Sequence, residues 1–185
     1  MTSVLGADMH RLVAAYPVES APDREVRADF ARFFGDAEGP VSRESGPAHA
    51  TASAFVFDPT LERLVLVFHR KGRFWVQPGG HLEPDDASIT AAALRELREE
   101  TGLEVAEAHD ADVYDLDHHP LSSAFGSCRS HLDVGIAIIA PDAADMTVSD
   151  ESEDVRWWPV DDLPPDVPAR FAERVQALRA RLRDH

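Results

Sequence analysis

The sequence predicts a mixed α/β protein in which helices cover a β-sheet. Two segments rich in apolar and β-branched residues, 50–58 and 62–70, are separated by Asp58-Pro59, a pattern typical of two strands joined by a turn. Alanine and leucine dominate residues 88–101, which favours a central helix. An apolar stripe at helical spacing in residues 166–183 indicates a terminal helix. Strands combined with such helices favour a mixed sheet with helices packed on it.

The remaining segments complete this arrangement. Residues 8–36 have helical spacing that is interrupted by prolines at 17–22, so we expect two short helices there, followed by a connector rich in Gly and Pro. The stretch 74–86 reads as a strand that runs into a Pro- and Gly-rich loop. Gly102 is expected to end the central helix. Further strands are expected within residues 103–119, 131–140 and 155–160.

Composition limits the functions open to the chain. Its 185 residues, 44% of them hydrophobic, suit one globular unit, with an N-terminal helical segment and connector over residues 1–49 and a main domain over residues 50–185. No apolar run approaches the roughly 18 residues that cross a bilayer, and no secretory signal opens the chain, so we expect a cytoplasmic protein that binds no membrane. Cys128 is the only cysteine, which excludes an internal disulfide.

Net charge and the acids of the central helix point to a cation. The net charge of −16 argues against a nucleic acid polymer as partner. At about 100° per residue, Glu96, Glu99 and Glu100 lie on or beside the apolar face of the helix. A solvated face with an Arg95–Glu99 pair would not explain carboxylates at that face, because partly buried carboxylates must be paired, neutralised or bound to metal. Mg²⁺ or Mn²⁺ suits such hard oxygen ligands, and it would separate an acidic protein from an anionic substrate.

The stretch GGHLEPDDASITAAALRELREETGL resembles the sequence box of the Nudix hydrolases, G-x5-E-x7-R-E-U-x-E-E-x-G-U, where U is aliphatic. Its second half, from Arg95 to Leu103, matches at every specified position. Its first half departs, because Asp86 replaces the first glutamate and eight residues instead of seven separate it from Arg95. The flanking FWVQPGG and EDVRWWPVDDLP also resemble segments of the family, so the resemblance covers about residues 50–165.

This resemblance implies an α/β/α sandwich around a mixed sheet and a hydrolase that cleaves a diphosphate linkage with Mg²⁺ or Mn²⁺. Glu96, Glu99, Glu100 and the main-chain carbonyl of Gly80 would be the metal ligands, with Glu99 and Glu100 central to catalysis, and Arg95 would hold one of the glutamates. The substrate would be a small molecule in which a nucleoside diphosphate is linked to another group: a nucleoside triphosphate, a nucleotide sugar or ADP-ribose.

The base that takes a proton from water has several candidates under this resemblance. It would be a glutamate of the box or one from a later loop, where Glu151 and Glu153 are available and Glu151 is preferred. A solvated acidic loop explains both residues equally well.

Four other residues are candidates for substrate contact. His81 beside the metal loop could contact phosphate or be a turn residue, and Trp75 could stack on a base or belong to the core. His131 lies on the polar face of a strand that could border the pocket, and His119 lies in the preceding segment. Another combination, a zinc site made of His118, His119, His131 and Asp133, fits no close structural zinc motif.

Two functions from other classes stay open. A catalytically silent member of the fold could bind a nucleotide and regulate another protein, although the repelling acids argue against it. An isopentenyl diphosphate isomerase shares the fold but uses a catalytic cysteine, and no nucleophile pattern surrounds Cys128. Insensitivity of activity to Cys128→Ser would remove that alternative. The oligomeric state is open between a monomer and a homodimer that uses residues 1–49.

Overall fold

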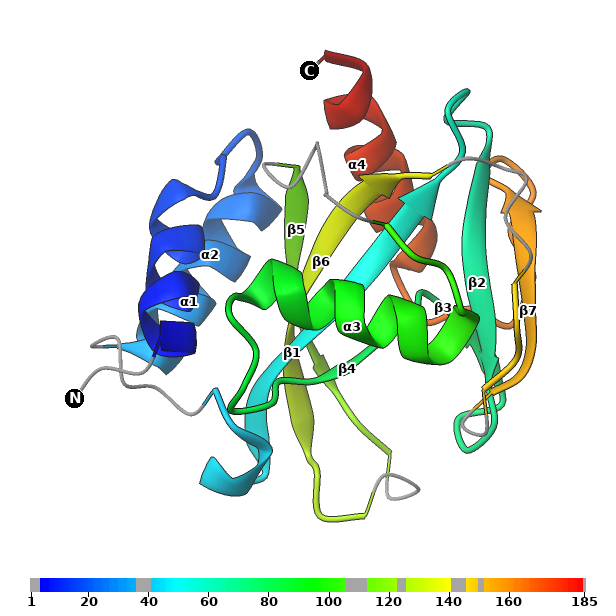
Figure 1. Ribbon diagram of the computed structural model, residues 1–185. Helices are drawn as coiled ribbons and strands as arrows, with labels where there is room; N and C mark the ends of the chain where they lie inside the picture. Colours follow the sequence, from blue (N-terminus) through cyan, green and yellow to red (C-terminus); the bar gives the residue numbers. More distant parts are fainter. Residues whose placement is uncertain are drawn as a thin grey trace.

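The protein is a three-layer α/β/α sandwich in a computed structural model (Figure 1). The structure describes residues 4–35, 41–105, 113–122, 126–140, 146–149 and 152–184. The helices are α1 (Val4–Ala15), α2 (Ala21–Phe34), the short 3₁₀ helix η1 (Arg43–Ser45), α3 (Ile89–Thr101) and α4 (Phe171–Asp184). The strands are β1 (Ala48–Phe57), β2 (Arg63–His69), β3 (Phe74–Val76), β4 (Gly79–His81), β5 (Tyr114–Pro120), β6 (Ser130–Ile139) and β7 (Ser152–Pro159).

One mixed sheet joins all seven strands, in the order β3-β2-β1-β6-β5, with β4 paired to β1 and β7 paired to β2. The pairing of β1 with β6 is parallel and runs over the full length of both strands, from Ala48 opposite Ser130 to Phe57 opposite Ile139. The other pairs are antiparallel. The sheet is therefore mixed, as predicted.

Alternating residues of β1 face different helical layers. Ala52 and Ala54 belong to an apolar cluster with residues of α1, α2 and α3, whereas Phe55 and Phe57 belong to a second cluster with α4. In Figure 1, α3 crosses one face of the sheet and α4 lies on the other. Since successive strand residues point to opposite faces, this alternation produces the two helical layers. The predicted sandwich is confirmed.

The N-terminal helices share the core of the sheet. Met9 and Phe30 are fully buried in the cluster that contains α3, and the Tyr114 hydroxyl of β5 donates to the Leu12 carbonyl at 2.7 Å. The Asp8 carboxylate of α1 accepts a hydrogen bond from the Ile89 backbone N–H at 2.8 Å, so it satisfies one of the free donors at the start of α3. The N-terminal segment therefore helps to hold α3 in place.

Some boundaries differ from the sequence expectation. The hairpin of β1 and β2 is paired only beside its turn, at Phe57 and Leu64. Farther along, β2 pairs with β3 at residues 67–69, while β7 pairs with β2 from Arg63 to His69. The expected loop contains β4, which pairs with β1. The terminal helix begins at Phe171 instead of 166, which is consistent with the prolines in residues 164–168. The strand expected within 103–119 covers residues 114–120, and residues 106–112 lie outside the described part.

Among the described residues, no helix is long and apolar enough to cross a bilayer.

Candidate active site

Helix α3 carries the acids at the centre of the site. It begins after Ser88, whose hydroxyl accepts from the Ala91 N–H at 3.0 Å, and ends at Gly102, which has a left-handed conformation with φ 72°. The predicted inner face is confirmed, because Ile89, Ala93 and Leu97 are fully buried. Both ends of the helix are therefore fixed by residues that suit these positions.

The three glutamates of α3 differ in exposure. Glu100 is buried at 7% exposure, the Glu96 side chain is 15% exposed and the Glu99 side chain is 52% exposed. The expectation that the acids lie on or beside the apolar face is confirmed, with Glu99 at its outer edge. A buried carboxylate needs a donor, and Glu100 accepts the Gly79 N–H at 2.9 Å.

Helix α3 approaches β4 closely at Gly80. A Cβ atom at this position would lie 2.6 Å from the Glu96 carboxylate, so only glycine lets that carboxylate lie against the strand. Gly79 carries the donor to Glu100 in the same strand. The short strand β4 therefore places the backbone of Gly79 next to Glu100 and the backbone of Gly80 next to Glu96.

Arg95 connects this group of acids. It donates to Glu96 at 2.9 Å and to Glu99 at 3.2 Å, and its Nη2 donates to the His81 carbonyl at 2.9 Å. Asp86 accepts two further bonds from the guanidinium, and these bonds, against the opposing effect of burial, raise the pKa of Arg95 further above its ordinary value. The prediction that Arg95 holds a glutamate agrees with these contacts.

Asp86 explains how the lengthened box still closes. Its two carboxylate oxygens accept from Nε and Nη2 of Arg95, both at 3.0 Å, across the eight intervening residues. Burial would raise the pKa of Asp86, but the hydrogen bonds from Arg95 and from the Glu83 N–H outweigh it and lower the pKa. The shorter acid at the end of a longer loop thus makes a two-point ion pair.

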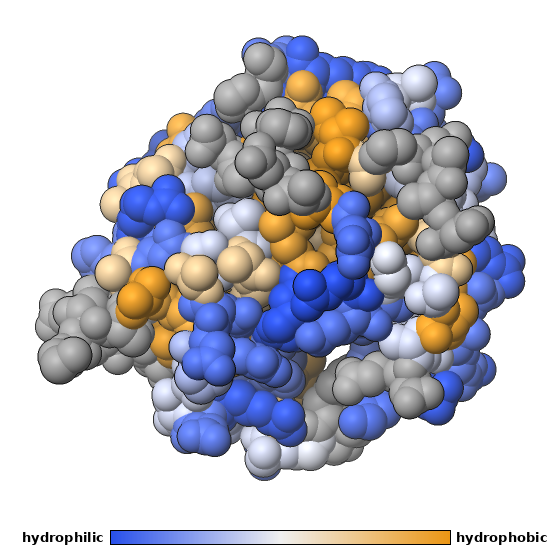
Figure 2. Space-filling model, viewed as in Figure 1, coloured by the Kyte–Doolittle hydropathy of each residue, from blue (hydrophilic) through white to orange (hydrophobic). Residues whose placement is uncertain are grey.

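The charges of the site favour a bound cation. Asp86, Glu96 and Glu99 share the guanidinium of Arg95, and Glu83 approaches it at 3.9 Å, while Glu100 lies on the same helix. The four carboxylates around Arg95, together with Glu100, leave a surplus of negative charge and of hard oxygen donors. This surplus fits a divalent cation such as Mg²⁺ or Mn²⁺. Figure 2 shows hydrophilic residues gathered over the region that α3 occupies in Figure 1.

Comparison with known proteins identifies this arrangement. The sequence profile of the family described as NUDIX domain matches residues 47–178, more than half of the chain. The chain belongs to the Nudix family. The resemblance seen in the sequence is thereby confirmed, as is the prediction of an enzyme of this pyrophosphohydrolase class.

Solved structures show the same fold. The Ap4A hydrolase of C. elegans, in a binary complex, has a TM-score of 0.63 at 16% identity, over 74% of this chain and 98% of that chain. The MutT protein of Methanosarcina mazei Go1 has a TM-score of 0.60 at 19% identity, over 74% and 96%. The NUDIX domain of Shewanella oneidensis NrtR, complexed with ADP ribose, has a TM-score of 0.55 at 20% identity, over 74% and 88%. The search of curated proteins found no match.

The residues proposed outside the Nudix box make contacts of their own. Glu153 is the second residue of β7 and forms an ion pair with Arg73, while Glu151 lies outside the described residues. Trp75 is half-buried and packs edge-on against Trp158, with ring centroids 5.2 Å apart, next to the α4 cluster. These contacts give Trp75 a packing role, as its alternative interpretation expected.

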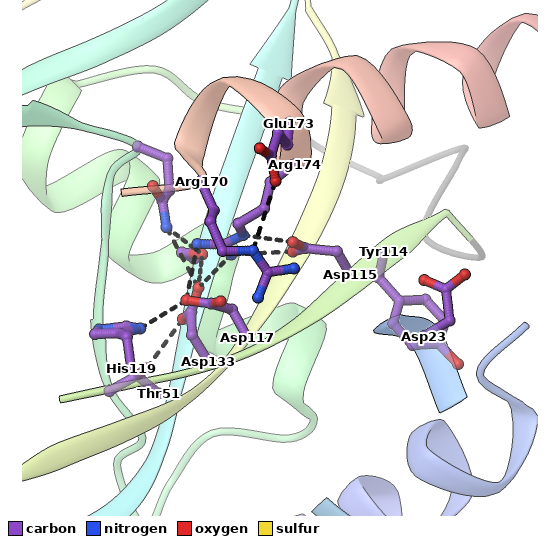
Figure 3. A network of polar contacts seen from close by, with 12 residues as sticks. Asp23, Thr51, Tyr114, Asp115, Asp117, His119, Asp133, Arg170, Glu173 and Arg174 are labelled. Carbon is purple, nitrogen blue, oxygen red and sulfur yellow. Dashed lines mark hydrogen bonds and ion pairs between the residues drawn. The ribbon is translucent and has the colours of Figure 1, made fainter. Parts of the chain in front are cut away.

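A buried polar network lies on the α4 face of the sheet (Figure 3). Arg174 of α4 donates to Asp115 at 3.1 Å, to Asp133 at 3.2 Å and to Asp117 at 3.3 Å. Asp133 also accepts from the hydroxyls of Thr51 at 2.9 Å and Ser53 at 2.7 Å and from Gln77 at 3.3 Å. Burial raises the pKa of Asp115 although Arg174 opposes the rise. The network links α4 to the segment that enters the Nudix box.

The histidines singled out from the sequence make several different contacts. His119 packs edge-on against His131, with ring centroids 5.8 Å apart. His118 pairs with Asp29, His119 Nδ1 lies 2.8 Å from Asp117, and Asp133 belongs to the Arg174 network. With these partners, His118, His119, His131 and Asp133 do not form a zinc site. His81 and His131 instead lie side by side, with ring centroids 5.2 Å apart. Burial, with smaller effects of nearby cations, lowers the pKa of His81 to about 4 and that of His131 to about 3.

Sequence reasoning missed the residues that tertiary pairing brings together. His49 lies in the segment interpreted as a connector, and Arg174 lies in a stretch interpreted only as a helical stripe. Asp8 lies near the start of a helix that seemed remote from the chemistry. The alternation of polar and apolar residues in β1 was the one available indication, because it shows that Thr51 and Ser53 share a face with His49.

Proposed function

We propose that the protein hydrolyses the diphosphate linkage of a nucleoside diphosphate joined to another group, using Mg²⁺ or Mn²⁺. The observation that carries this proposal is the set of carboxylates on α3, two of them largely buried, beside the guanidinium of Arg95. We assign the metal to Glu96, Glu99, Glu100 and the Gly80 carbonyl. When bound, a divalent cation polarises phosphoryl oxygens and lowers the pKa of water.

The protein residues contribute orientation. Arg95 holds Glu96 and Glu99, and Asp86 fixes Arg95 in turn, so the carboxylates are positioned before substrate arrives. Glu100 is fixed separately by the Gly79 N–H. Preorganised charges of this kind stabilise a transition state without a cost of rearrangement during the reaction.

For the base that accepts the proton of the attacking water, we propose Glu151 ahead of Glu153. The ion pair with Arg73 holds the Glu153 carboxylate at the start of β7. Glu151→Gln should lower turnover by about a hundredfold or more and flatten the acidic limb of the pH–rate profile, whereas Glu153→Gln should leave both within about threefold. The reverse pattern would transfer the role to Glu153, and two silent variants would point to a glutamate of the box.

The substrate class follows from the family and the charge. A nucleoside triphosphate, a nucleotide sugar and ADP-ribose all carry the diphosphate that such a site needs. Structures of similar fold include an Ap4A hydrolase and a NUDIX domain complexed with ADP ribose, which supports a nucleotide-type ligand. Between these compounds the choice depends on pocket contacts and not on the fold.

The test is release of phosphate from purified protein in the presence of a coupled phosphatase. The panel holds nucleoside triphosphates, nucleotide sugars, ADP-ribose and dinucleoside polyphosphates, each with Mg²⁺ or Mn²⁺. Activity that chelator abolishes and that Glu100→Gln lacks would support the proposal and exclude a contaminating phosphatase. Binding of these compounds without any turnover would overturn it in favour of a silent regulatory module.

A further inference from the structure

Three histidines and the cysteine of this chain meet at one point outside the Nudix box. His49 of β1 lies opposite His131 in the parallel pair with β6, and His81 ends β4 beside the same part of β1. Cys128 precedes β6 and is buried. One donor atom from each of these four residues lies within 4.8 Å of every other. Four segments of the chain therefore deliver nitrogen and sulfur donors to a single place.

The three imidazole rings have nearly equal spacing. Their centroids are 5.0 Å apart for His49 and His81, 5.1 Å for His49 and His131, and 5.2 Å for His81 and His131. Three imidazoles bound tetrahedrally to zinc at about 2.0–2.1 Å have ring centroids about 5 Å apart. The arrangement of the rings thus agrees with three ligands around one ion.

Two ring nitrogens of this cluster are buried without a hydrogen-bond partner in the described part of the chain. They are His81 Nε2 and His131 Nε2. Such atoms are rare in folded proteins and call for an explanation. His49 Nδ1 lies 2.9 Å from the Gly46 carbonyl and so donates to it, which leaves the lone pair of Nε2 directed towards Cys128 Sγ at 3.9 Å. A carbonyl that fixes the tautomer of a histidine in this way is typical of metal ligands.

We propose that His49, His81, Cys128 and His131 bind one structural zinc ion. The donor set has three nitrogens and one sulfur, which suits Zn²⁺ and not Mg²⁺, and four protein ligands close the coordination sphere, as in structural sites. Tetrahedral zinc places its donors about 3.3–3.6 Å apart, so the His49–Cys128 pair at 3.9 Å is already close. No donor pair has to close by more than roughly 1.5 Å, since all lie within 4.8 Å of one another. Binding displaces the Cys128 thiol proton to solvent.

The ion would support the Nudix box without taking part in its chemistry. It would tie β4 to β1 and β6 on the α4 face, while Gly80 of β4 faces Glu96 on the other side of the sheet. The His81 carbonyl also accepts from Arg95. This proposal is independent of the substrate, since it rests on donors that differ from the oxygen ligands of the box.

The first experiment measures metal in tag-free protein purified without chelator. We expect about one zinc per chain that survives dialysis. Replacement by Co²⁺ should give a thiolate-to-cobalt charge-transfer band and the intense visible bands of tetrahedral geometry. Cobalt at the glutamates alone gives neither feature. Less than about a tenth of an equivalent of zinc after supplementation, together with no charge-transfer band, would overturn the proposal.

Variants locate the ion. Cys128→Ser and His49→Gln should retain zinc at least about tenfold more weakly, whereas Glu100→Gln should retain it fully and thereby exclude the box. His118→Gln is the matched control, because it removes a histidine of β5 outside the cluster. Should a ligand variant fail to fold, the cobalt spectrum of the unaltered protein decides the matter alone. Full zinc retention in folded Cys128→Ser, with an unchanged cobalt spectrum, would contradict the assignment.

Discussion

Asp86 and Arg95 form a two-point ion pair in which both nitrogen–oxygen distances are 3.0 Å. The pair closes a loop that is one residue longer than the usual pattern, and it leaves the Nη1 group of Arg95 directed at Glu96 and Glu99. A planar guanidinium can serve both sides at once because its donors form a fixed fork. Through Arg95, the loop that contains Asp86 therefore helps to fix the positions of Glu96 and Glu99 on α3.

Arg95→Lys tests this positioning role. Lysine keeps the charge but cannot span Asp86, Glu96 and the His81 carbonyl together, so we expect turnover to fall by about tenfold to a hundredfold at saturating Mg²⁺. The measurement is kcat on the best substrate of the panel. Arg98→Lys, an exposed position of the same helix, is the matched control and should stay near the unaltered rate. Equal rates in both variants would remove the positioning role of Arg95.

Asp86→Asn should destabilise the protein in a pH-dependent way. Because the folded pKa of Asp86 is lowered, its carboxylate contributes stability above the unfolded pKa of about 3.9, and this contribution is lost as pH falls through the folded pKa. We expect a loss of about 1–3 kcal/mol at pH 7 that shrinks between pH 5 and pH 3. Urea unfolding at several pH values measures it, with the exposed Asp85→Asn as control. A loss that is constant with pH would contradict the charged pair.

Glu99→Gln and Glu100→Gln should each lower turnover by at least about a hundredfold, since each removes charge from the proposed metal site. Glutamine keeps the shape, and at Glu100 it keeps an oxygen that can accept from the Gly79 N–H, so the unfolding temperature should change little. Titration with Mn²⁺ should show weaker metal binding in both. The exposed Glu104→Gln serves as control. Near-normal turnover in both box variants would overturn the metal assignment.

The parts of the site that sequence could predict depend on local periodicity. A helix repeats every 3.6 residues, so the burial of Ile89, Ala93 and Leu97 and the position of Glu100 followed from spacing alone. The stripe of α4 was predictable for the same reason, because Phe171 and Val175 are both buried. A mixed sheet with helices packed on it followed from these stripes and the strand patterns, whereas the α/β/α sandwich was implied by the family resemblance.

The residues that escaped prediction meet only through strand register. His49 and His131 are 82 positions apart and become neighbours because β1 pairs with β6 in parallel, a pairing that no local pattern specifies. Asp115 meets Arg174 because β5 adds to the edge of that sheet under α4. The order of strands decides such contacts, and strand order follows from the packing of the whole chain.

Arg174→Met tests the network that this strand order creates. Removal of the guanidinium would leave Asp115 and Asp133 buried and close together without a compensating charge, so we expect a loss of about 3–5 kcal/mol in the free energy of unfolding. The loss should diminish at low pH, because burial already raises the pKa of Asp115 and its protonation relieves the repulsion between the two carboxylates. Urea unfolding at pH 5 and pH 8 measures both effects.

Arg170→Met is the matched control for that experiment. Its side chain is 65% exposed and pairs with Glu173 on the surface, so it should cost less than about 0.5 kcal/mol. A loss in Arg174→Met no larger than this would mean that the three aspartates find water or one another without cost, and the network would then have no structural role. A large loss with normal zinc content would separate the Arg174 network from the histidine and cysteine cluster on the same face of the sheet.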